Sequence, residues 1–465
     1  MKKKFLLSLL LIIFVLTYLL INQSINDDRF SFIKKLIPHE IKHTIKYYLF
    51  SHKIIKEKEK KLFIQGNQYD NVVEYLKFKG HPLKDEIKVK EKLEDLNFNR
   101  RSEKIIQIFN KTSTLETYKN EFQINLGIWE YFPGSAYLEY FENNLFIISS
   151  TGILAFTQKL KGEKIIFKQI KNNIGEFINE KQFIKKGPFS IKDLKIYNGK
   201  IYVSFTNELK ENCWLTSIIY AELNYEEVIF KNLFEPNQCA HSYDDEDFNG
   251  LSSAGRIVIL DENHIIFSHG DYGRRKSAQN EKTIFGKILK ININNGNYSV
   301  LSMGHRNPQG LYYNQSKNFV LLTEHGPQGG DEINLISLKE KKIFNYGWPM
   351  SSYGEHYGGK EGRNKHKYKK FPLYKSHKNH GFEEPLKYFV PSIAISEIVG
   401  VGNEKYIFAS MKDKSIYTFE LDKNNTIQNL KRIQIDERIR DLIYNGNKIF
   451  LFLENSATIA ILNYK

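Results

Sequence analysis

One hairpin pattern occurs six times between about residue 125 and the C-terminus, at 137–149, 194–204, 256–268, 310–323, 397–410 and 441–453. Each copy has an alternating strand, a short turn rich in Asn, Asp or Gly, and then an apolar strand. Alternation beside such turns is typical of β-hairpins. A hairpin that recurs every roughly 40–90 residues predicts a β-propeller, in which each blade buries its face against the next. Six copies predict six blades and argue against a β-sandwich, whose strands are spaced more evenly.

The composition supports a large folded protein. The chain has 465 residues, of which 41% are hydrophobic and 14% aromatic, so it is not wholly disordered. Two cysteines, Cys213 and Cys239, exclude a disulfide-stapled scaffold and any four-cysteine metal site. In an oxidising compartment these two are candidates for a disulfide. The net charge of +15 is concentrated near the N-terminus, and no nucleic-acid-reading module is present, so we expect no nucleic-acid partner.

The N-terminal segment reads as a membrane signal. Lys2, Lys3 and Lys4 precede an apolar run over 5–21, and no small-x-small cleavage site follows. We therefore expect 1–21 to be an uncleaved signal anchor rather than a cleaved signal peptide. The positive-inside rule then places the rest of the chain outside the cytoplasm, in the periplasm or an equivalent space, anchored in the cytoplasmic membrane.

The middle of the chain differs from the part that follows it. Residues 22–124 are rich in Lys and Glu and predict a basic, partly helical spacer, with helices over 39–61 and 85–109. The propeller is expected over 125–465. We expect the stretch between Asp331 and Pro391 to form an elaborate loop, and its histidine-containing part, 355–381, to be mobile and solvated.

Several uncommon motifs then occur in order, and they carry a family resemblance. The chain reads G-H-R-N-P-Q-G at 304–310, T-E-H-G-P-Q-G-G-D-E-I-N-L-I at 323–336 and N-Y-G-W-P at 345–349. It continues with P-S-I-A at 391–394, S-M-K at 410–412 and R-I-R-D at 438–441. This string resembles the soluble pyrroloquinoline quinone (PQQ)-dependent sugar dehydrogenases, the glucose/sorbosone dehydrogenase family. The resemblance covers roughly 125–465 and implies a six-bladed propeller that binds PQQ and Ca²⁺.

The resemblance implies which residues hold the quinone, and their chemistry is suitable. PQQ is planar and carries three carboxylates, so its site needs fixed cations; the implied cations are Arg306, Lys412, Arg438 and Arg440. Arg438 and Arg440 are two residues apart, so on a strand they share a face, and guanidinium groups bind carboxylates in a bidentate manner. Asn307 is implied to contact the quinone.

Calcium is implied at the neighbouring glycine-rich loop. Gly326 and Pro327 would present backbone carbonyls to Ca²⁺, a hard cation that prefers oxygen ligands. Of the acidic pair, Asp331 would lie near the cofactor and Glu332 in a second calcium site. His325 stands where glucose-oxidising members carry Gln, and it either contacts the cofactor or hydrogen-bonds beside it.

One departure from the family concerns catalysis. The family's catalytic His lies four residues before the Arg of its G-R-hydrophobic strand, and here Ser252 occupies that position before Arg256. A serine hydroxyl is not a general base near neutral pH. His269 and His241 could replace it, although each can equally be structural.

The leading expectation is therefore oxidation of an aldose or related alcohol, with electrons passed to a membrane or periplasmic acceptor. The alternative is a non-catalytic quinoprotein-like propeller that binds a glycan or a protein at the cell surface.

Overall fold

The computed structural model describes residues 95–120, 135–150, 152–160, 162–178, 191–242, 247–362 and 365–464. All of them lie within one unit of the chain, Lys60–Lys465. The predicted signal anchor at 5–21 and the predicted helix at 39–61 lie outside these ranges. Within them, no helix has the length and apolar character needed to cross a bilayer.

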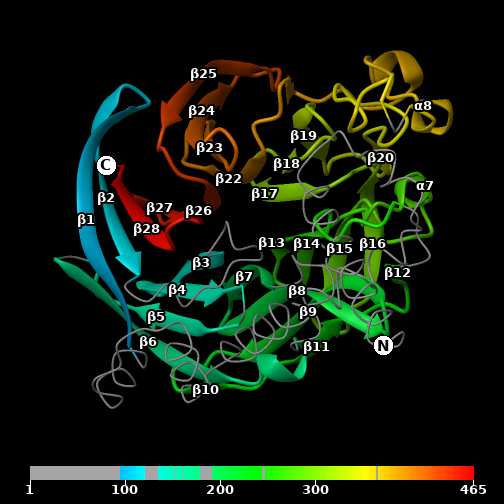
Figure 1. Ribbon diagram of the computed structural model, residues 1–465. Coiled ribbons are helices and arrows are strands. Elements are labelled where there is room, and N and C mark those ends of the chain that lie inside the picture. Colours follow the sequence, from blue (N-terminus) through cyan, green and yellow to red (C-terminus); the bar gives the residue numbers. More distant parts are fainter. Residues whose placement is uncertain are drawn as a thin grey trace, which may run out of the picture. The chain divides into compact units, whose positions relative to one another are not determined.

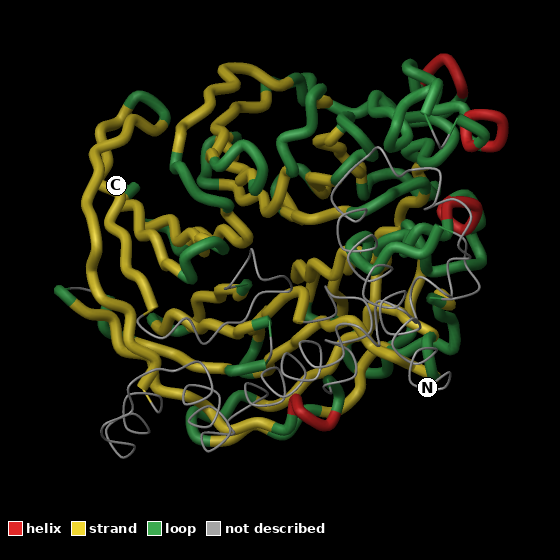
Figure 2. Tube along the Cα trace, viewed as in Figure 1, coloured by secondary structure: helices red, strands yellow, loops and turns green. Residues whose placement is uncertain are grey.

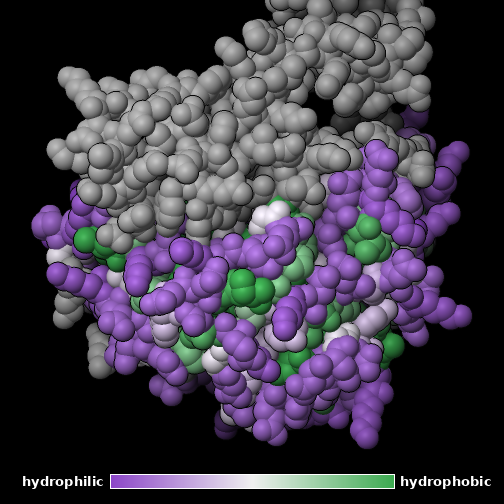
Figure 3. All heavy atoms as spheres, turned by 90° about the horizontal axis from the view of Figure 1, so that it is seen from below, coloured by the Kyte–Doolittle hydropathy of each residue, from purple (hydrophilic) through white to green (hydrophobic). Residues whose placement is uncertain are grey.

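The described part of the chain is almost entirely β-structure. Its helical segments are short and lie toward the outside of the strands (Figure 2): η2 (Ile174–Glu176), α7 (Arg275–Ala278), α8 (Lys367–Lys370) and η3 (Lys378–His380). The surface seen in Figure 3 is mostly hydrophilic, with hydrophobic residues scattered among hydrophilic ones.

The described strands form five sheets, which Figure 1 shows arranged around a common centre. The largest sheet contains, in order, β26 (Ile439–Tyr444), β27 (Lys448–Leu453), β28 (Thr458–Asn463), β2 (Lys111–Asn120), β1 (Asp95–Ile108), β6 (Lys164–Asn172), β5 (Leu154–Thr157), β4 (Asn144–Ser149) and β3 (Ala136–Phe141), with β10 (Glu227–Val228) beside β6.

The other four sheets follow one another along the chain. The first contains β7 (Ile191–Tyr197), β8 (Lys200–Lys210), β9 (Cys213–Glu222), β11 (Lys231–Phe234) and β12 (Ala240–His241). The next contains β13 (Ala254–Asp261), β14 (His264–His269), β15 (Lys287–Asn292), β16 (Tyr298–Met303) and β20 (Phe344–Asn345). The last two contain β17 (Pro308–Asn314), β18 (Phe319–Glu324), β19 (Asp331–Ser337) and β21 (Lys387–Phe389), and then β22 (Ile395–Gly400), β23 (Lys405–Ser410), β24 (Ser415–Leu421) and β25 (Ile427–Gln434).

Each of the six predicted hairpins is confirmed as an antiparallel pair, namely β3–β4, β7–β8, β13–β14, β17–β18, β22–β23 and β26–β27. The first strands of these hairpins contact one another in a closed cycle, β3–β7–β13–β17–β22–β26–β3. The fold is therefore propeller-like, and the starts of these strands meet around its centre.

Side-chain hydroxyls join neighbouring hairpins near this centre. Several of the sequence repeats end in Ser or Thr, in the second strand of the hairpin. These hydroxyls donate to carbonyls on the first strand of the next hairpin, in the pairs Ser204–Gly255, Ser268–Pro308 and Thr323–Ser396. The repeated hydroxyl thus fixes the position of each sheet against the following one.

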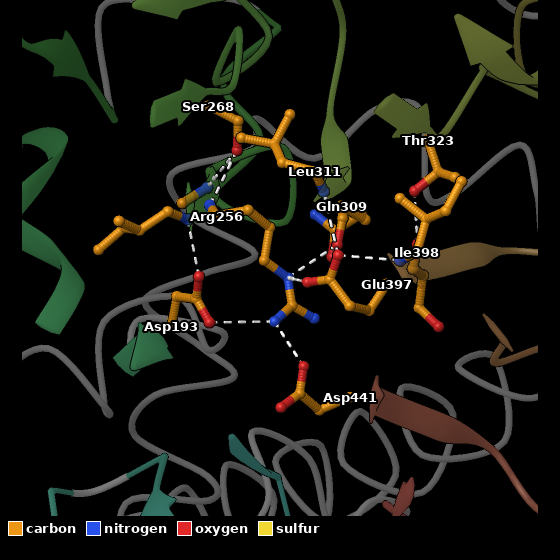
Figure 4. Close-up of polar contacts among 12 residues, drawn as sticks. Asp193, Arg256, Ser268, Gln309, Leu311, Thr323, Glu397, Ile398 and Asp441 are labelled. Carbon is orange, nitrogen blue, oxygen red and sulfur yellow. Dashed lines mark hydrogen bonds and ion pairs between the residues drawn. The ribbon is translucent and has the colours of Figure 1, made fainter. Parts of the chain in front are cut away.

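A buried arginine joins its own hairpin to four others (Figure 4). Arg256 on β13 contacts three carboxylates, at 3.2 Å from Asp193, 2.7 Å from Asp441 and 3.0 Å from Glu397. Its guanidinium also lies 4.9 Å from the ring centroid of Tyr137. These partners come from β7, β26, β22 and β3, so one cation compensates carboxylates from across the centre of the fold.

Two predictions about secondary structure are wrong. Residues Asp95–Ile108 form strand β1, not a helix, and β1 pairs with both β2 and β6. Ile106 and Ile108 are buried while Ile105 is 69% exposed. The Lys- and Glu-containing residues before them therefore belong to the solvent-exposed part of a strand. The sheets therefore begin at Asp95, upstream of the predicted start at 125.

The histidine-containing loop is also less solvated than predicted. His356 and His377 are each 1% exposed. The His356 ring nitrogen Nε2 donates to the Phe371 carbonyl at 2.8 Å, and His377 stacks on Tyr353 with ring centroids 5.3 Å apart. Aromatic stacking and backbone bonds thus fold this loop back on itself.

Candidate active site

The loop between β18 and β19 presents two carbonyls to a positive charge. Arg306 Nη1 accordingly donates to the carbonyls of His325 at 3.2 Å and Gly326 at 2.8 Å. A Cβ on Gly326 would lie 2.2 Å from the Gly330 carbonyl oxygen, so only glycine fits there. The two carbonyls that face a cation in this structure are those of His325 and Gly326, and the cation is the Arg306 guanidinium. The predicted pair was Gly326 and Pro327, so only the Gly326 carbonyl is common to both.

A buried carboxylate positions Arg306. Glu324, at the end of β18, accepts from His305 Nδ1, from the Arg306 backbone N–H and from Asn334 Nδ2, each at 2.9 Å. Although burial opposes ionisation, the neighbouring His305 ring lowers the pKa of Glu324. Trp348, from the N-Y-G-W-P motif, lies beneath the Arg306 guanidinium, whose central carbon is 5.7 Å from the ring centroid. Sequence reasoning did not assign Glu324 or Trp348, although both lie inside quoted motifs.

Asp331 is placed as a support for two loops. Its Oδ1 accepts from the Gly326 N–H at 3.2 Å. Its Oδ2 accepts from three groups of the P-S-I-A segment, namely Ser392 Oγ, the Ile393 N–H and the Ala394 N–H. The carboxylate is fully buried and is satisfied by these bonds. It therefore orders the calcium loop and does not present a free oxygen to a cofactor.

His325 has a fixed tautomer. Its Nε2 lies 2.6 Å from the Ile395 carbonyl, which can only accept, so Nε2 carries the proton and Nδ1 of the neutral ring is an acceptor. Burial lowers the pKa of His325, and the positive charges of Arg306 and Arg440 act in the same direction, against Asp331. These interactions place His325 between the calcium loop and the predicted arginine pair.

The arginine pair shares one buried carboxylate. Glu454, only 1% exposed, accepts from Arg438 Nε at 3.0 Å and from Arg440 Nη2 at 2.6 Å. Arg438 and Arg440 therefore converge on the same carboxylate, although Arg438 lies just before β26 and is not part of that strand. Although burial opposes ionisation, Arg440 and Arg438 lower the pKa of Glu454. Glu454 follows the last predicted hairpin and lies in no motif, so no local pattern could have identified it.

Lys412 lies beside this pair. Its backbone N–H donates to the Ile393 carbonyl at 3.0 Å, and its neighbour Met411 contacts Arg438 Nη2 through sulfur at 3.5 Å. The Lys412 residue is exposed. The backbone of Lys412 is thereby joined to the segment that Asp331 holds, and Arg438 contacts the residue before Lys412.

The acidic part of the site fits a hard cation. Burial, together with the charge of nearby Glu324, raises the pKa of Glu332 well above its usual value. The Oδ1 atom of Asn334 has no hydrogen-bond partner, and Glu332 Oε1 is 3.5 Å from His377 Nε2. A cavity of about 10 Å³, lined by Gly326, Glu324 and Glu332 among others, has room for about one water or small ion. The carboxyl oxygens of Glu324 and Glu332 are ligands of the kind that calcium accepts, and Arg306 and His377 line the same cavity.

The predicted catalytic position holds no base. Ser252 is 2% exposed, and its hydroxyl is 3.2 Å from Asn249 Nδ2, which donates to it. Asn307 donates through its amide to the Leu251 carbonyl and accepts from the Ala254 N–H, both at 3.1 Å. Asn307 therefore ties down the loop that carries Ser252.

Neither alternative histidine is suited to replace that base. His269 is fully buried, accepts from the Thr216 N–H at 3.1 Å and donates to the Gly270 carbonyl at 2.9 Å. Burial lowers the pKa of His269 to about 3, and both ring nitrogens are occupied. His241 lies 3.3 Å from Cys213 Sγ, beside the Cys213–Cys239 disulfide, which is confirmed. The contacts of both histidines are therefore those of structural residues.

Comparison with known proteins gives relatives of one kind. An aldose sugar dehydrogenase of Escherichia coli, YliI, is 29% identical over 215 residues, which are 42% of this chain and 54% of that protein. Quinoprotein glucose dehydrogenase B of Acinetobacter calcoaceticus is 33% identical over 126 residues, 21% of this chain and 25% of that protein. The chain thus spans about half or less of the length of these curated relatives.

Solved structures share the fold. The soluble aldose sugar dehydrogenase of Escherichia coli in its apo form gives a TM-score of 0.57 at 21% identity, covering 71% of this chain and 96% of that one. The PQQ-bound aldose sugar dehydrogenase of Streptomyces coelicolor gives 0.53 at 17% identity, covering 71% and 94%. The model of the glucose/sorbosone dehydrogenase family matches residues 195–462. That match spans more than half of the sequence, and the chain belongs to the glucose/sorbosone dehydrogenase family.

Proposed function

We propose that this protein is a PQQ-dependent dehydrogenase that oxidises an aldose or a related alcohol. Calcium would be held by Gly326 and Pro327, with a second ion at Glu332, and the electrons would pass to a membrane or periplasmic acceptor. The observation that carries this proposal is the pairing of Arg438 and Arg440 with the single carboxylate Glu454. Two guanidinium groups that converge at one place suit an anionic ligand, because guanidinium binds carboxylates in a bidentate manner.

The residues of the chain divide the work of binding. Arg438, Arg440 and exposed Lys412 would hold carboxylates, since guanidinium and ammonium groups form short, strong bonds to them. Arg306 would move from the Gly326 carbonyl to let calcium reach it. The chemistry that PQQ would supply when bound is acceptance of a hydride, which carries the two electrons of the oxidation.

The described residues of the site do not include an evident base for removing the proton from the sugar hydroxyl. The hydroxyl of Ser252 cannot serve as a base near neutral pH, and His269 has no unoccupied nitrogen. His325 Nδ1 can accept a hydrogen bond and orient a hydroxyl group. The absence of a base at Ser252 and His269 favours the second candidate function, a non-catalytic propeller that binds a glycan or a protein at the cell surface.

Architecture and location complete the proposal. We infer six blades, which the closed cycle of six first strands supports. We also place the propeller outside the cytoplasm, anchored by residues 5–21. The Cys213–Cys239 disulfide supports an oxidising compartment.

Dye reduction by the full-length protein tests the enzymatic proposal. The protein is loaded with PQQ and Ca²⁺ and assayed with a panel of aldoses. We expect slow oxidation by the wild type and a faster rate for Ser252→His, because that variant supplies the missing base. The matched control is Ser316→His, in the exposed turn between β17 and β18, where an imidazole should change nothing.

Two outcomes decide against parts of the proposal. Quinone binding without dye reduction in either the wild type or Ser252→His would support the non-catalytic candidate. Fast wild-type oxidation that is unchanged in Ser252→His would show that another group removes the proton.

A further inference from the structure

Three aromatic rings form a stacked column that begins at the candidate site. His377 is 1% exposed, and its Nε2 lies 3.5 Å from Glu332 Oε1. It lines the same cavity as Arg306. The ring of Tyr353 stacks on His377 with centroids 5.3 Å apart, and Tyr388 stacks on Tyr353 with centroids 3.7 Å apart. The last ring, Tyr388, is 44% exposed, so the column connects the site with the solvent.

The exposed end of the column adjoins the proposed calcium loop. Tyr388 lies on β21, opposite Glu332 of β19 in the paired strands. The carbonyl of Phe389 accepts from the Gly330 N–H at 2.8 Å, and the next residue, Val390, is 60% exposed. An aromatic and an aliphatic side chain are therefore exposed beside the site. Aromatic side chains are enriched where proteins contact one another.

The stretch of chain that carries this surface is basic. Between 355 and 390 the sequence has nine Lys and Arg residues against four Glu. Lys378 and Lys387 are exposed, and Lys387 directly precedes Tyr388. The backbone N–H of Lys378 and the hydroxyl of the middle ring both donate to Glu384, at 3.2 and 3.0 Å, so Lys378 lies beside the column. Such charges attract a partner with an acidic surface and speed its encounter.

We propose that Tyr388, Val390, Lys378 and Lys387 form a docking patch for the electron acceptor, a protein with an acidic face and a one-electron copper or haem centre. The inference rests on the proposed function, because it concerns the electrons taken from the sugar. Complexes of redox proteins use small, transient interfaces, and a short exposed strand between lysines suits a contact of that kind.

The stacked rings would carry the electrons from the site to this patch. Two electrons and two protons leave the reduced cofactor; the electrons reduce two cupric centres to cuprous ones in succession, and the protons pass to water. The rings themselves are not oxidised. Electron transfer slows steeply as donor and acceptor move apart, so ring-to-ring contacts favour this exit over a longer one through solvent.

Binding to the cofactor-free, full-length protein tests the docking patch without any turnover. The probe is plastocyanin, a blue-copper protein with an acidic face, titrated calorimetrically at low salt. Cytochrome c, which is basic, serves as the probe of opposite charge. We expect only plastocyanin to bind, and its affinity should fall as salt is added, because salt screens exposed charges.

Charge reversal locates the binding on the surface. The double variant Lys378→Glu, Lys387→Glu should bind plastocyanin roughly tenfold more weakly or worse, because the steering charges change sign. The matched control is Lys231→Glu, Lys423→Glu, which changes the net charge equally. Both control lysines are exposed and lie in other sheets, on β11 and in the turn between β24 and β25, so the affinity should change less than about twofold.

Stopped-flow mixing tests the column. The protein is loaded with PQQ and Ca²⁺, reduced chemically and mixed with oxidised plastocyanin, whose blue absorbance disappears on reduction. Tyr388→Leu keeps an apolar side chain on β21 but removes the last ring, so copper reduction should slow while reduction of a small dye stays unchanged. The matched control is Tyr298→Leu, which removes a tyrosine of similar exposure, 39%, from β16 and should change neither rate.

The outcomes separate this inference from the function on which it rests. If the Lys378, Lys387 variant binds plastocyanin as tightly as the control pair, or the wild type does not bind it, the docking patch is refuted. Equal copper reduction by the wild type and Tyr388→Leu refutes the column.

Two other occupants of the patch would also refute the proposal. They are a second copy of this chain, seen as a dimer that the charge reversal dissociates, and a membrane, seen as adherence to anionic phospholipid vesicles that the same variant loses. PQQ binding is measured separately in every variant. Its absence from all of them would overturn the proposed function and the role of the acceptor together.

Discussion

Replacing Arg256 by Met should destabilise the protein strongly. Arg256 is 3% exposed and lies within 3.2 Å of Asp193, 3.0 Å of Glu397 and 2.7 Å of Asp441. Its Nε and Nη2 atoms also donate to the carbonyls of Gln309 and Arg440 at 2.8 and 3.0 Å. Removing one partner of a buried ion pair costs about 3–5 kcal/mol, because it leaves an uncompensated charge.

This free energy can be converted into a melting temperature. With an unfolding entropy of about 2 cal/mol/K per residue, a loss of 3–5 kcal/mol in a unit of this size lowers Tm by roughly 4–7 °C. The assay is thermal unfolding followed by circular dichroism. Met keeps much of the aliphatic volume, so the change is mainly electrostatic.

The matched control is Arg432→Met. Arg432 binds Asp413 at 2.6 Å, but its side chain is 47% exposed, so water replaces the lost partner and Tm should hardly change. If Arg256→Met lowers Tm no more than Arg432→Met does, the reasoning about the buried charge cluster is refuted.

Three further predictions concern stability. Burial raises the pKa of Glu397 to about 8, so its stabilising contribution is lost as the pH rises through that value. Glu397→Gln should therefore gain stability relative to the wild type between pH 6 and pH 9 in melting experiments, and a constant difference would contradict this. The Cys213–Cys239 disulfide has a sequence separation of 26, and Cys239→Ser should cost about 3–4 kcal/mol; an unchanged urea midpoint would argue against it. Gly326→Ala would place a Cβ 2.2 Å from the Gly330 carbonyl oxygen, so the rise in Tm on adding Ca²⁺ should shrink, whereas an undiminished rise would remove this loop from calcium binding.

The hairpins were predictable because their signal is local. Alternation and the turn residues lie within about a dozen residues, and those hairpins formed. Strand β1 was not predicted, for two reasons. It joins two parts of one sheet, and its exposed residues include Lys, Arg and Glu, which resemble those of a solvated helix. Its partners β2 and β6 could not be inferred from its own residues.

The site was predictable only as far as the motifs reach. Arg306, Gly326 and Arg440 were named from the resemblance, and the structure connects them through His325. The support given by Asp331 and the pairing with Glu454 depend on contacts between loops, which spacing does not reveal.

The proposed cofactor site is tested most directly by titrating the purified full-length protein with PQQ, with Ca²⁺ and then with a chelator. Arg438→Met is measured in parallel, because Glu454 keeps its bonds to Arg440 in that variant. We expect saturable binding that the chelator abolishes and that Arg438→Met weakens by roughly tenfold or more. Absence of saturable binding, or tight binding that depends on neither calcium nor Arg438, would contradict the assignment of this site.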